Sequence, residues 1–216
     1  QKAAETLQQA DQLLERMRGN RRTERYLNRW VRGIERARYF VYSNQGDLDS
    51  AYLALKKALE VSDELITAYS SEQLQRRSPH EHRHNEKLRA LMARFLAKQG
   101  DMAEAETLIR QTLDDTLQRA GRNSLDTVNI LRAFIDVLNG QQRYAEAERL
   151  AAAALDIRRR VGVPESAAPM LQGQMDLVKT LLYQHRADEV LRIYEQLQER
   201  LQDNPSLLNK INSDPN

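Results

Sequence analysis

Apolar residues recur along the chain with the period of an α-helix. Between Asp126 and Asn139 they return every three or four positions, and a second series of the same kind follows after a short break. The first series is Val128, Leu131, Phe134, Ile135 and Leu138, and the second is Tyr144, Ala147, Leu150, Ala151, Ala154 and Leu155. Residues at this spacing share one face of a helix. The pattern therefore predicts two consecutive amphipathic helices joined by a short turn.

The phrase at this turn occurs four times. It reads QGDLDSAYLALKKAL at 45–59, QGDMAEAETLIRQTL at 99–113, QQRYAEAERLAAAAL at 141–155 and, more weakly, QHRADEVLRIYEQL at 184–197. Aligned on the small residues Ala51, Ala105, Ala147 and Val190, the copies are 54, 42 and 43 residues apart. One helix pair cannot bury its own apolar face, so a fixed period in this range indicates stacked pairs. The predicted fold is all-α.

Glycine marks the predicted helix ends. Gly46, Gly100 and Gly140 fall between the two helices of a unit, and Gly19, Gly121 and Gly162 fall where second helices should end. Glycine is common after helices because it adopts positive φ without strain. Ser124 precedes the next helix as an expected N-cap.

The motifs QGDLDSA, QGDMAEA and QQRYAEA resemble the inter-helix turn and small packing position of the tetratricopeptide repeat family. The resemblance covers roughly residues 22–201, and the first 18 residues resemble the second helix of a truncated earlier unit. The 42-residue spacing exceeds the usual unit of about 34 residues. It is similar to the longer-helix subclass found in kinesin light chains and bacterial multidomain proteins. The resemblance implies a right-handed α-solenoid of stacked antiparallel helix pairs that binds partner proteins.

We expect one repeat domain over residues 1–208, with about four helix pairs and an N-terminal helix, followed by a flexible polar tail at 209–216. The 54-residue interval holds about 12 residues more than the next one. The stretch ITAYSSEQLQRRSPHEHRH supplies them. Either the helix after Leu48 continues to about Arg77, or a loop is inserted before Pro79.

The composition of the chain argues against several classes of function. The formal net charge of +2 gives no overall field toward nucleic acid or membrane, and no apolar run reaches the ~18 residues of a membrane span. Cysteine is absent, which excludes disulfides and thiolate chemistry and fits a reducing cytoplasm and a periplasm equally. Of the two compartments, we expect the cytoplasm. A bacterial periplasmic location also fits if Gln1 follows a cleaved signal peptide, since the chain begins without Met.

The sequence contains no catalytic motif and no phosphate-binding loop, so we expect neither an enzyme nor a cofactor. Its histidine cluster is His80, His82 and His84. On a helix, residues two apart point in nearly opposite directions and cannot share a metal. We therefore expect a solvated, polar inter-helix segment and no metal.

Basic residues are concentrated near the N-terminus. From Arg16 to Arg38 nine arginines stand against two glutamates, and five of them form a stripe along one helix face. The stripe is Arg22, Arg25, Arg29, Arg32 and Arg36. It is either a docking strip for phosphate, nucleic acid or an acidic protein, or a solvated face whose arginines pair with acids of the neighbouring helix.

In the family that the chain resembles, the first helices line a concave groove that grips an extended peptide. Counting back from the small residue, the positions expected to face it are Arg36, Lys87, Arg94, Lys98, Asn129, Arg132, Asp136, Asn139 and Lys179. Six cations against one acid predict a positive groove, and the Asn side chains offer a peptide backbone both donors and acceptors. The alternative is that these are ordinary exposed residues of first helices.

Three hypotheses of function follow. The first is a scaffold that binds an acidic, extended segment of a partner protein in this groove. The second is binding of a polyanion, nucleic acid or a phosphorylated ligand, through the arginine stripe, against which the near-neutral total charge stands. The third is a regulatory repeat module of a larger bacterial enzyme. Self-association through the exposed apolar end of the array stays open beside them.

Overall fold

The helices of the structure follow the apolar periodicity of the sequence. The computed structural model describes residues 2–18, 21–68 and 78–202, with side chains for 5–18, 26–68 and 79–199. Within these ranges every regular element is an α-helix. The chain divides into two compact units, Gln1–Phe95 and Leu96–Asn216, and the division falls inside one helix. The single domain expected over 1–208 stays a prediction, and the tail at 209–216 lies outside the described residues.

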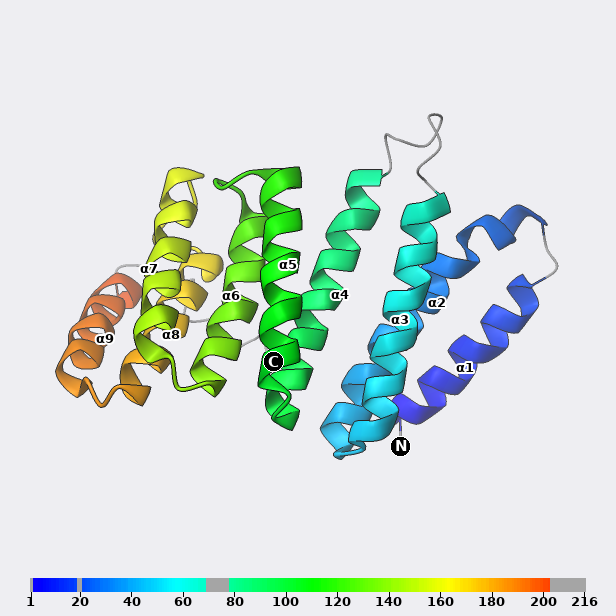
Figure 1. Ribbon diagram of the computed structural model, residues 1–216, viewed down its shortest axis with the longest axis horizontal. Helices are drawn as coiled ribbons and strands as arrows, with labels where there is room; N and C mark the ends of the chain where they lie inside the picture. The colour runs from blue at the N-terminus through cyan, green and yellow to red at the C-terminus, as the bar shows by residue number, and fades with distance from the viewer. Residues whose placement is uncertain (1, 19–20, 69–77, 203–216) are drawn as a thin grey trace. The chain divides into compact units, whose positions relative to one another are not determined.

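The first unit contains α1 (Lys2–Met17), α2 (Arg21–Gln45), α3 (Leu48–Ala68) and most of α4 (Ser78–Gln99). Helices α2 and α3 form an antiparallel pair (Figure 1). Small and medium apolar residues of α3 make the centre of this pair, and Ala51 is completely buried. The Phe95 ring stacks on Tyr52 and meets Tyr39 edge-on, which joins α4 to both helices.

The second unit contains the end of α4 and the helices α5 (Met102–Ala120), α6 (Leu125–Gly140), α7 (Tyr144–Arg160), α8 (Ala168–Tyr183) and α9 (Ala187–Gln202). Each of α5 to α8 packs against the next helix, and α6 also touches α8 (Figure 1). The helical face predicted from the apolar series is confirmed, because Val128, Leu131 and Ala154 pack together in the core. Ala105 and Ala147 are completely buried, as expected for the small packing position.

The four repeated turns share one backbone geometry. The second turn residue has positive φ in every copy, and this residue and the one after it donate to the last turn of the helix through 5→2 and 6→1 hydrogen bonds. These positive-φ residues are Gly46, Gly100, Gln142 and His185. This is the Schellman motif, which satisfies helix carbonyls that would otherwise lack donors. The prediction for Gly140 was wrong, since it lies inside α6 and Gln142 takes the left-handed position.

The connection between α5 and α6 follows the capping rules. Gly121 ends α5 with positive φ and donates to the Leu117 carbonyl, and the Ser124 hydroxyl accepts from the Thr127 amide at 3.1 Å. The expected N-cap is therefore confirmed. Gly19 and the choice between helix and loop at 69–77 lie outside the described residues, although α3 is described to Ala68 and α4 begins at Ser78.

Candidate partner-binding surface

Two arginines of the basic stripe are used inside the first unit. Arg29 donates to Glu81 at 2.9 Å and Arg32 at 2.5 Å, and these contacts link α2 to the start of α4. Burial alone would raise the pKa of Glu81, but the hydrogen bonds and charges of Arg32 and Arg29 outweigh it and hold the pKa below its ordinary value. Glu81 is almost inaccessible to solvent. The two arginines thus share one buried carboxylate, which is the pairing with a neighbouring helix foreseen as the structural alternative.

The remaining members of the stripe differ from one another. Arg36 is exposed, and its guanidinium lies 5.7 Å from the centre of the Phe40 ring. The side chains of Arg22 and Arg25 lie outside the described residues. The stripe is therefore not a uniform row of solvated charges.

The histidine cluster lies on a helix. His80, His82 and His84 belong to the first turns of α4, so the expected inter-helix segment was wrong for these three residues. The helix begins at Ser78, and proline is tolerated in a first helical turn because its missing N–H has no partner there in any case. Within the described part of the chain, no three metal-ligating side chains come together.

In the second unit, first-helix cations form ion pairs between consecutive repeats. Arg132 of α6 donates to Asp176 of α8 at 2.6 Å, and Lys179 of α8 donates to Asp136 of α6 at 3.1 Å. Both pairs are partly exposed, so the cations are still reachable from solvent. The sequence analysis counted Asp136 as the acid of this surface, and the structure adds Asp176.

The other expected groove residues are placed as follows. Asn139 is buried and donates to the Thr180 hydroxyl at 3.1 Å, which joins α6 to α8. Asn129, Lys87 and Lys98 are exposed, as a partner-binding residue must be. Arg94 is partly buried near the Tyr39 hydroxyl, in the first unit. The expected set thus combines exposed side chains with one that serves packing.

The sequence analysis missed Arg158. This residue of α7 is only 2% exposed, and its Nη1 has no hydrogen-bond partner. Burial lowers the pKa of its guanidinium, the Asp176 carboxylate opposes this shift, and Arg132 adds to it. Two guanidinium groups therefore lie near one carboxylate. The spacing from Ala151, Ala154 and Leu155 places Arg158 on the buried face, a signal that the run of three arginines at 158–160 concealed.

A ladder of polar contacts connects consecutive turns of the second unit. Arg143, before α7, donates to Glu106 of α5 at 2.8 Å and to Glu146 in the first turn of its own helix at 2.7 Å. The hydrogen bonds from Arg143 are the largest cause that lowers the pKa of Glu106 to about 2, with Gln141 and Arg110 contributing.

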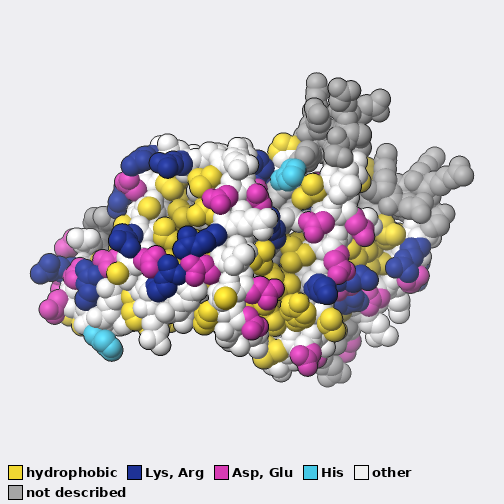
Figure 2. Space-filling view, viewed as in Figure 1, with side chains coloured by type: hydrophobic (Ala, Val, Ile, Leu, Met, Phe, Trp, Pro, Cys, Tyr) yellow, Lys and Arg dark blue, Asp and Glu magenta, His cyan; other side chains and the backbone are white. Residues whose placement is uncertain are grey.

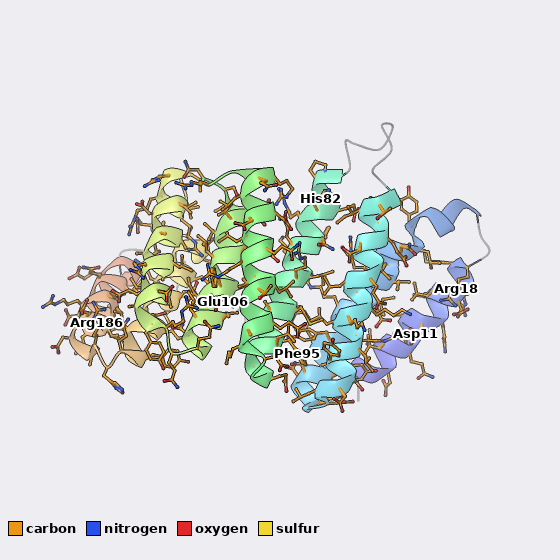
Figure 3. All side chains as sticks on the ribbon, viewed as in Figure 1. Asp11, Arg18, His82, Phe95, Glu106 and Arg186 are labelled. Atoms are coloured by element: carbon orange, nitrogen blue, oxygen red, sulfur yellow. The ribbon has the colours of Figure 1, made fainter. Side chains whose placement is uncertain are left out.

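The same arrangement recurs 43 residues later. Arg186, before α9, contacts Glu148 of α7 and Glu189 in its own helix, and Gln184 donates to Glu148 at 2.9 Å. Figure 3 labels Glu106 and Arg186 as the two ends of this series. On the face formed by α5 and α7, basic and acidic side chains are accordingly intermixed (Figure 2).

A concave feature lies in the first unit, between α1, α2 and α3. Its volume is about 470 Å³, and its wall includes the ion-paired cluster of Asp11, Glu35 and Arg38 beside apolar residues such as Leu53. No helix in the described ranges is long and apolar enough to cross a membrane.

Comparison with known proteins agrees with the architecture. A family profile described as Tetratricopeptide repeat matches residues 86–160. These residues are tetratricopeptide repeats. The predicted all-α solenoid of this repeat type is confirmed. A search of curated protein sequences finds no match.

Several solved structures are similar in fold to this chain. One is a Podosopora anserina putative kinesin light chain with nearly identical TPR-like repeats, at TM-score 0.65 and 14% identity over 94% of this chain and 89% of that one. A second structure of that protein gives TM-score 0.61 and 13% identity over the same shares. BtubC (BKLC) from P. vanneervenii gives TM-score 0.58 and 14% identity over 100% of this chain and 92% of that one. At these identities the likeness concerns the fold alone.

Proposed function

We propose that this repeat array is a protein-interaction scaffold that binds an acidic, extended segment of a partner along its first helices. Tetratricopeptide repeats generally mediate protein–protein contacts, and the family profile covers the central helices of this chain. The observation that carries the finer proposal is the charge balance at α6, α7 and α8. There the Arg132 guanidinium donates to the Asp176 carboxylate, whose charge also acts on the buried guanidinium of Arg158 and opposes the lowering of its pKa.

A carboxylate from a partner would complete this charge balance. Arg132 keeps about a quarter of its side chain exposed, so a partner carboxylate can approach it and compete with Asp176. Asp176 then has Arg158 as a second counter-charge, because the Nη1 of Arg158 has no acceptor in the unbound state. Charge-assisted hydrogen bonds of this kind contribute roughly 1.5–3 kcal/mol each. Asn129, exposed one turn before Arg132, is suited to pair with the backbone of an extended segment.

The arginine stripe is the weaker site for a polyanion, because Arg29 and Arg32 already hold the buried Glu81. A polyanion that recruited them would leave a carboxylate buried without its partners, at a cost of several kcal/mol. A ligand that binds Arg132 meets no comparable cost, because Arg158 can then balance the charge of Asp176. The first-helix surface of the second unit therefore fits an acidic ligand better than the stripe does.

The test compares two soluble peptides of about twelve residues, one with alternating Glu and apolar residues and one with Gln in place of Glu. We expect the wild type to prefer the Glu peptide by at least tenfold at about 0.1 M salt, as measured by fluorescence anisotropy. The preference should disappear in an Arg132→Gln, Lys179→Gln variant. Equal affinity of the wild type for both peptides would contradict the proposal.

An Arg159→Gln, Arg160→Gln variant is the matched control. These two arginines are exposed at the end of α7 and pair with Glu165 and Asp156, away from the first helices. The control removes the same number of charges, so it should retain the preference. A loss of preference in the control as well would mean that net charge alone attracts the peptide.

A further inference from the structure

The last helix pair exposes five large apolar side chains, namely Tyr183, which is 45% exposed, and four others that are more than half exposed. Met175 and Leu182 of α8 are each 54% exposed, and Leu191 and Tyr194 of α9 are 57% and 55% exposed. In a stacked array the terminal repeat needs a polar outer face to stay soluble. The last described helix pair has these four apolar side chains in place of a polar outer face. Their presence at the surface needs an explanation.

The preceding pair shows what these four positions normally do. Shifted back by 43 residues, they correspond to Arg132, Asn139, Glu148 and Ala151. Each of the first three residues contacts the next repeat, through Asp176, Thr180 and Arg186 respectively. Ala151 is almost fully buried. These are the positions by which one helix pair holds the pair that follows it.

In the last pair, the residues at all four of these positions differ in polarity or size from those of the preceding pair. Each polar group that engages the following pair is replaced by an apolar residue, and the small alanine by a tyrosine. A further repeat of the same kind would bring a turn arginine onto Leu191, where it would find no carboxylate. The face therefore cannot form the arginine–glutamate contact that a further repeat would need, and it is too apolar to serve as the polar outer face of a terminal repeat.

The size and charge of the face are suited to a copy of itself. Four side chains of this size, each just over half exposed, present roughly 400 Å² of apolar surface, which is near the largest patch of a typical monomer. Two such patches with their polar rims approach the ~1,200 Å² of a specific interface. Exposed charges of both signs surround the patch, namely Asp188, Arg192 and Glu195. A two-fold axis can bring Arg192 of one copy to the acids of the other.

We propose that the face formed by Met175, Leu182, Leu191 and Tyr194 is a homodimer interface, by which two copies of this chain join end to end. The interface is isologous, and it uses residues other than those proposed to bind the acidic segment. Dimerisation therefore places two peptide-binding surfaces in one particle, and it is tested at residues that the peptide-binding experiment leaves unchanged.

Sedimentation equilibrium of the whole chain between about 1 and 100 μM tests the proposal. We expect a monomer–dimer equilibrium in this range, and at least tenfold weaker association in a Leu191→Gln, Tyr194→Gln variant. A Leu13→Gln variant is the control, because Leu13 is also 57% exposed but lies on α1. It should associate like the wild type.

Two results would overturn the proposal. One is a folded wild type that stays monomeric at 100 μM, and the other is a variant that dimerises as strongly as the wild type. If the wild type is monomeric and its urea stability falls in the double variant, another segment of the same chain covers this face. Circular dichroism of each variant separates these results from a loss of folding.

Discussion

The Arg158 guanidinium lies against the backbone of Gly173 on the neighbouring helix. A Cβ added at Gly173 would come 2.7 Å from Nη1 of Arg158 and 2.8 Å from Cδ2 of Leu155. Both distances are well below ordinary van der Waals contact. The glycine therefore makes room for a buried cation, although it costs α8 about 1 kcal/mol relative to alanine in a helix interior.

Gly173→Ala should destabilise the fold by about 1–3 kcal/mol, because the buried neighbours cannot move away freely. In an Arg158→Ala background the cost should be clearly smaller, since only the Leu155 contact remains. Urea denaturation of the four proteins in this double-mutant cycle measures the coupling. Strictly additive costs would mean that the two residues do not press on each other.

Arg158→Met should leave the stability unchanged or raise it by about 1–3 kcal/mol. Methionine keeps the length of the side chain but removes a buried charge that lacks a direct partner, and Asp176 keeps its pair with Arg132. Arg159→Met, at an exposed position, should change the stability by less than about 0.5 kcal/mol. A loss above about 2 kcal/mol in Arg158→Met alone would show that its charge is needed for folding.

Glu106 should contribute to the acid sensitivity of the second unit. Its pKa is about 2 in the folded protein, below the ordinary value of 4.5, so the folded state binds fewer protons than the unfolded state between these pH values. The stabilisation is thus fully present above pH about 4.5 and is lost as the pH falls toward 2. Urea midpoints measured across this window should fall less steeply for Glu106→Gln than for the wild type.

Glu104→Gln provides the comparison for that pH series. Glu104 is exposed in the first turn of α5, two residues before Glu106, so its replacement makes an equal change in charge. This variant should keep the steep acid dependence of the wild type. Parallel pH profiles for Glu106→Gln and the wild type would show that the ladder does not control acid sensitivity.

Replacing the residues with positive φ in the third and fourth turns by glycine should stabilise the fold. Gln142 and His185 have φ of 60° and 59°, which costs a residue with a Cβ about 1 kcal/mol. Gln142→Gly and His185→Gly should each stabilise the fold by up to ~1 kcal/mol, after the added flexibility of the unfolded chain is subtracted. The reverse change, Gly100→Ala, should destabilise it by at least about as much. Thermal unfolding followed by circular dichroism measures all three variants.

The helices and their packing faces could be predicted from the sequence because both depend on local spacing. The apolar series on either side of the third turn, the buried Ala147 and the Ser124 cap all follow from residues a few positions apart. The turn after α6 differs from the prediction, because its residue with positive φ is Gln142 and not Gly140. There the Schellman hydrogen bonds hold Gln142 in that conformation instead.

The candidate surface was less predictable, because its electrostatics depend on pairs 41 to 52 residues apart. Arg132 and Asp176 are 44 positions apart, Asn139 and Thr180 are 41 apart, and Arg29 and Glu81 are 52 apart. The stagger between neighbouring helices decides which of these residues meet, and no local pattern encodes that stagger. Arg158 was missed for a related reason, since a basic run at a helix end is typical of a solvated terminus.

The contact between each turn arginine and the glutamate one repeat before it also gives the units a fixed order. Asp101 stands where Arg143 and Arg186 stand in the later turns, and Leu191 stands where Glu106 and Glu148 stand. A chain assembled with these units exchanged would bring aspartate to a carboxylate and arginine to leucine. The repeats are therefore alike in shape but not interchangeable, so a duplication or deletion of one unit would need compensating substitutions at its seams.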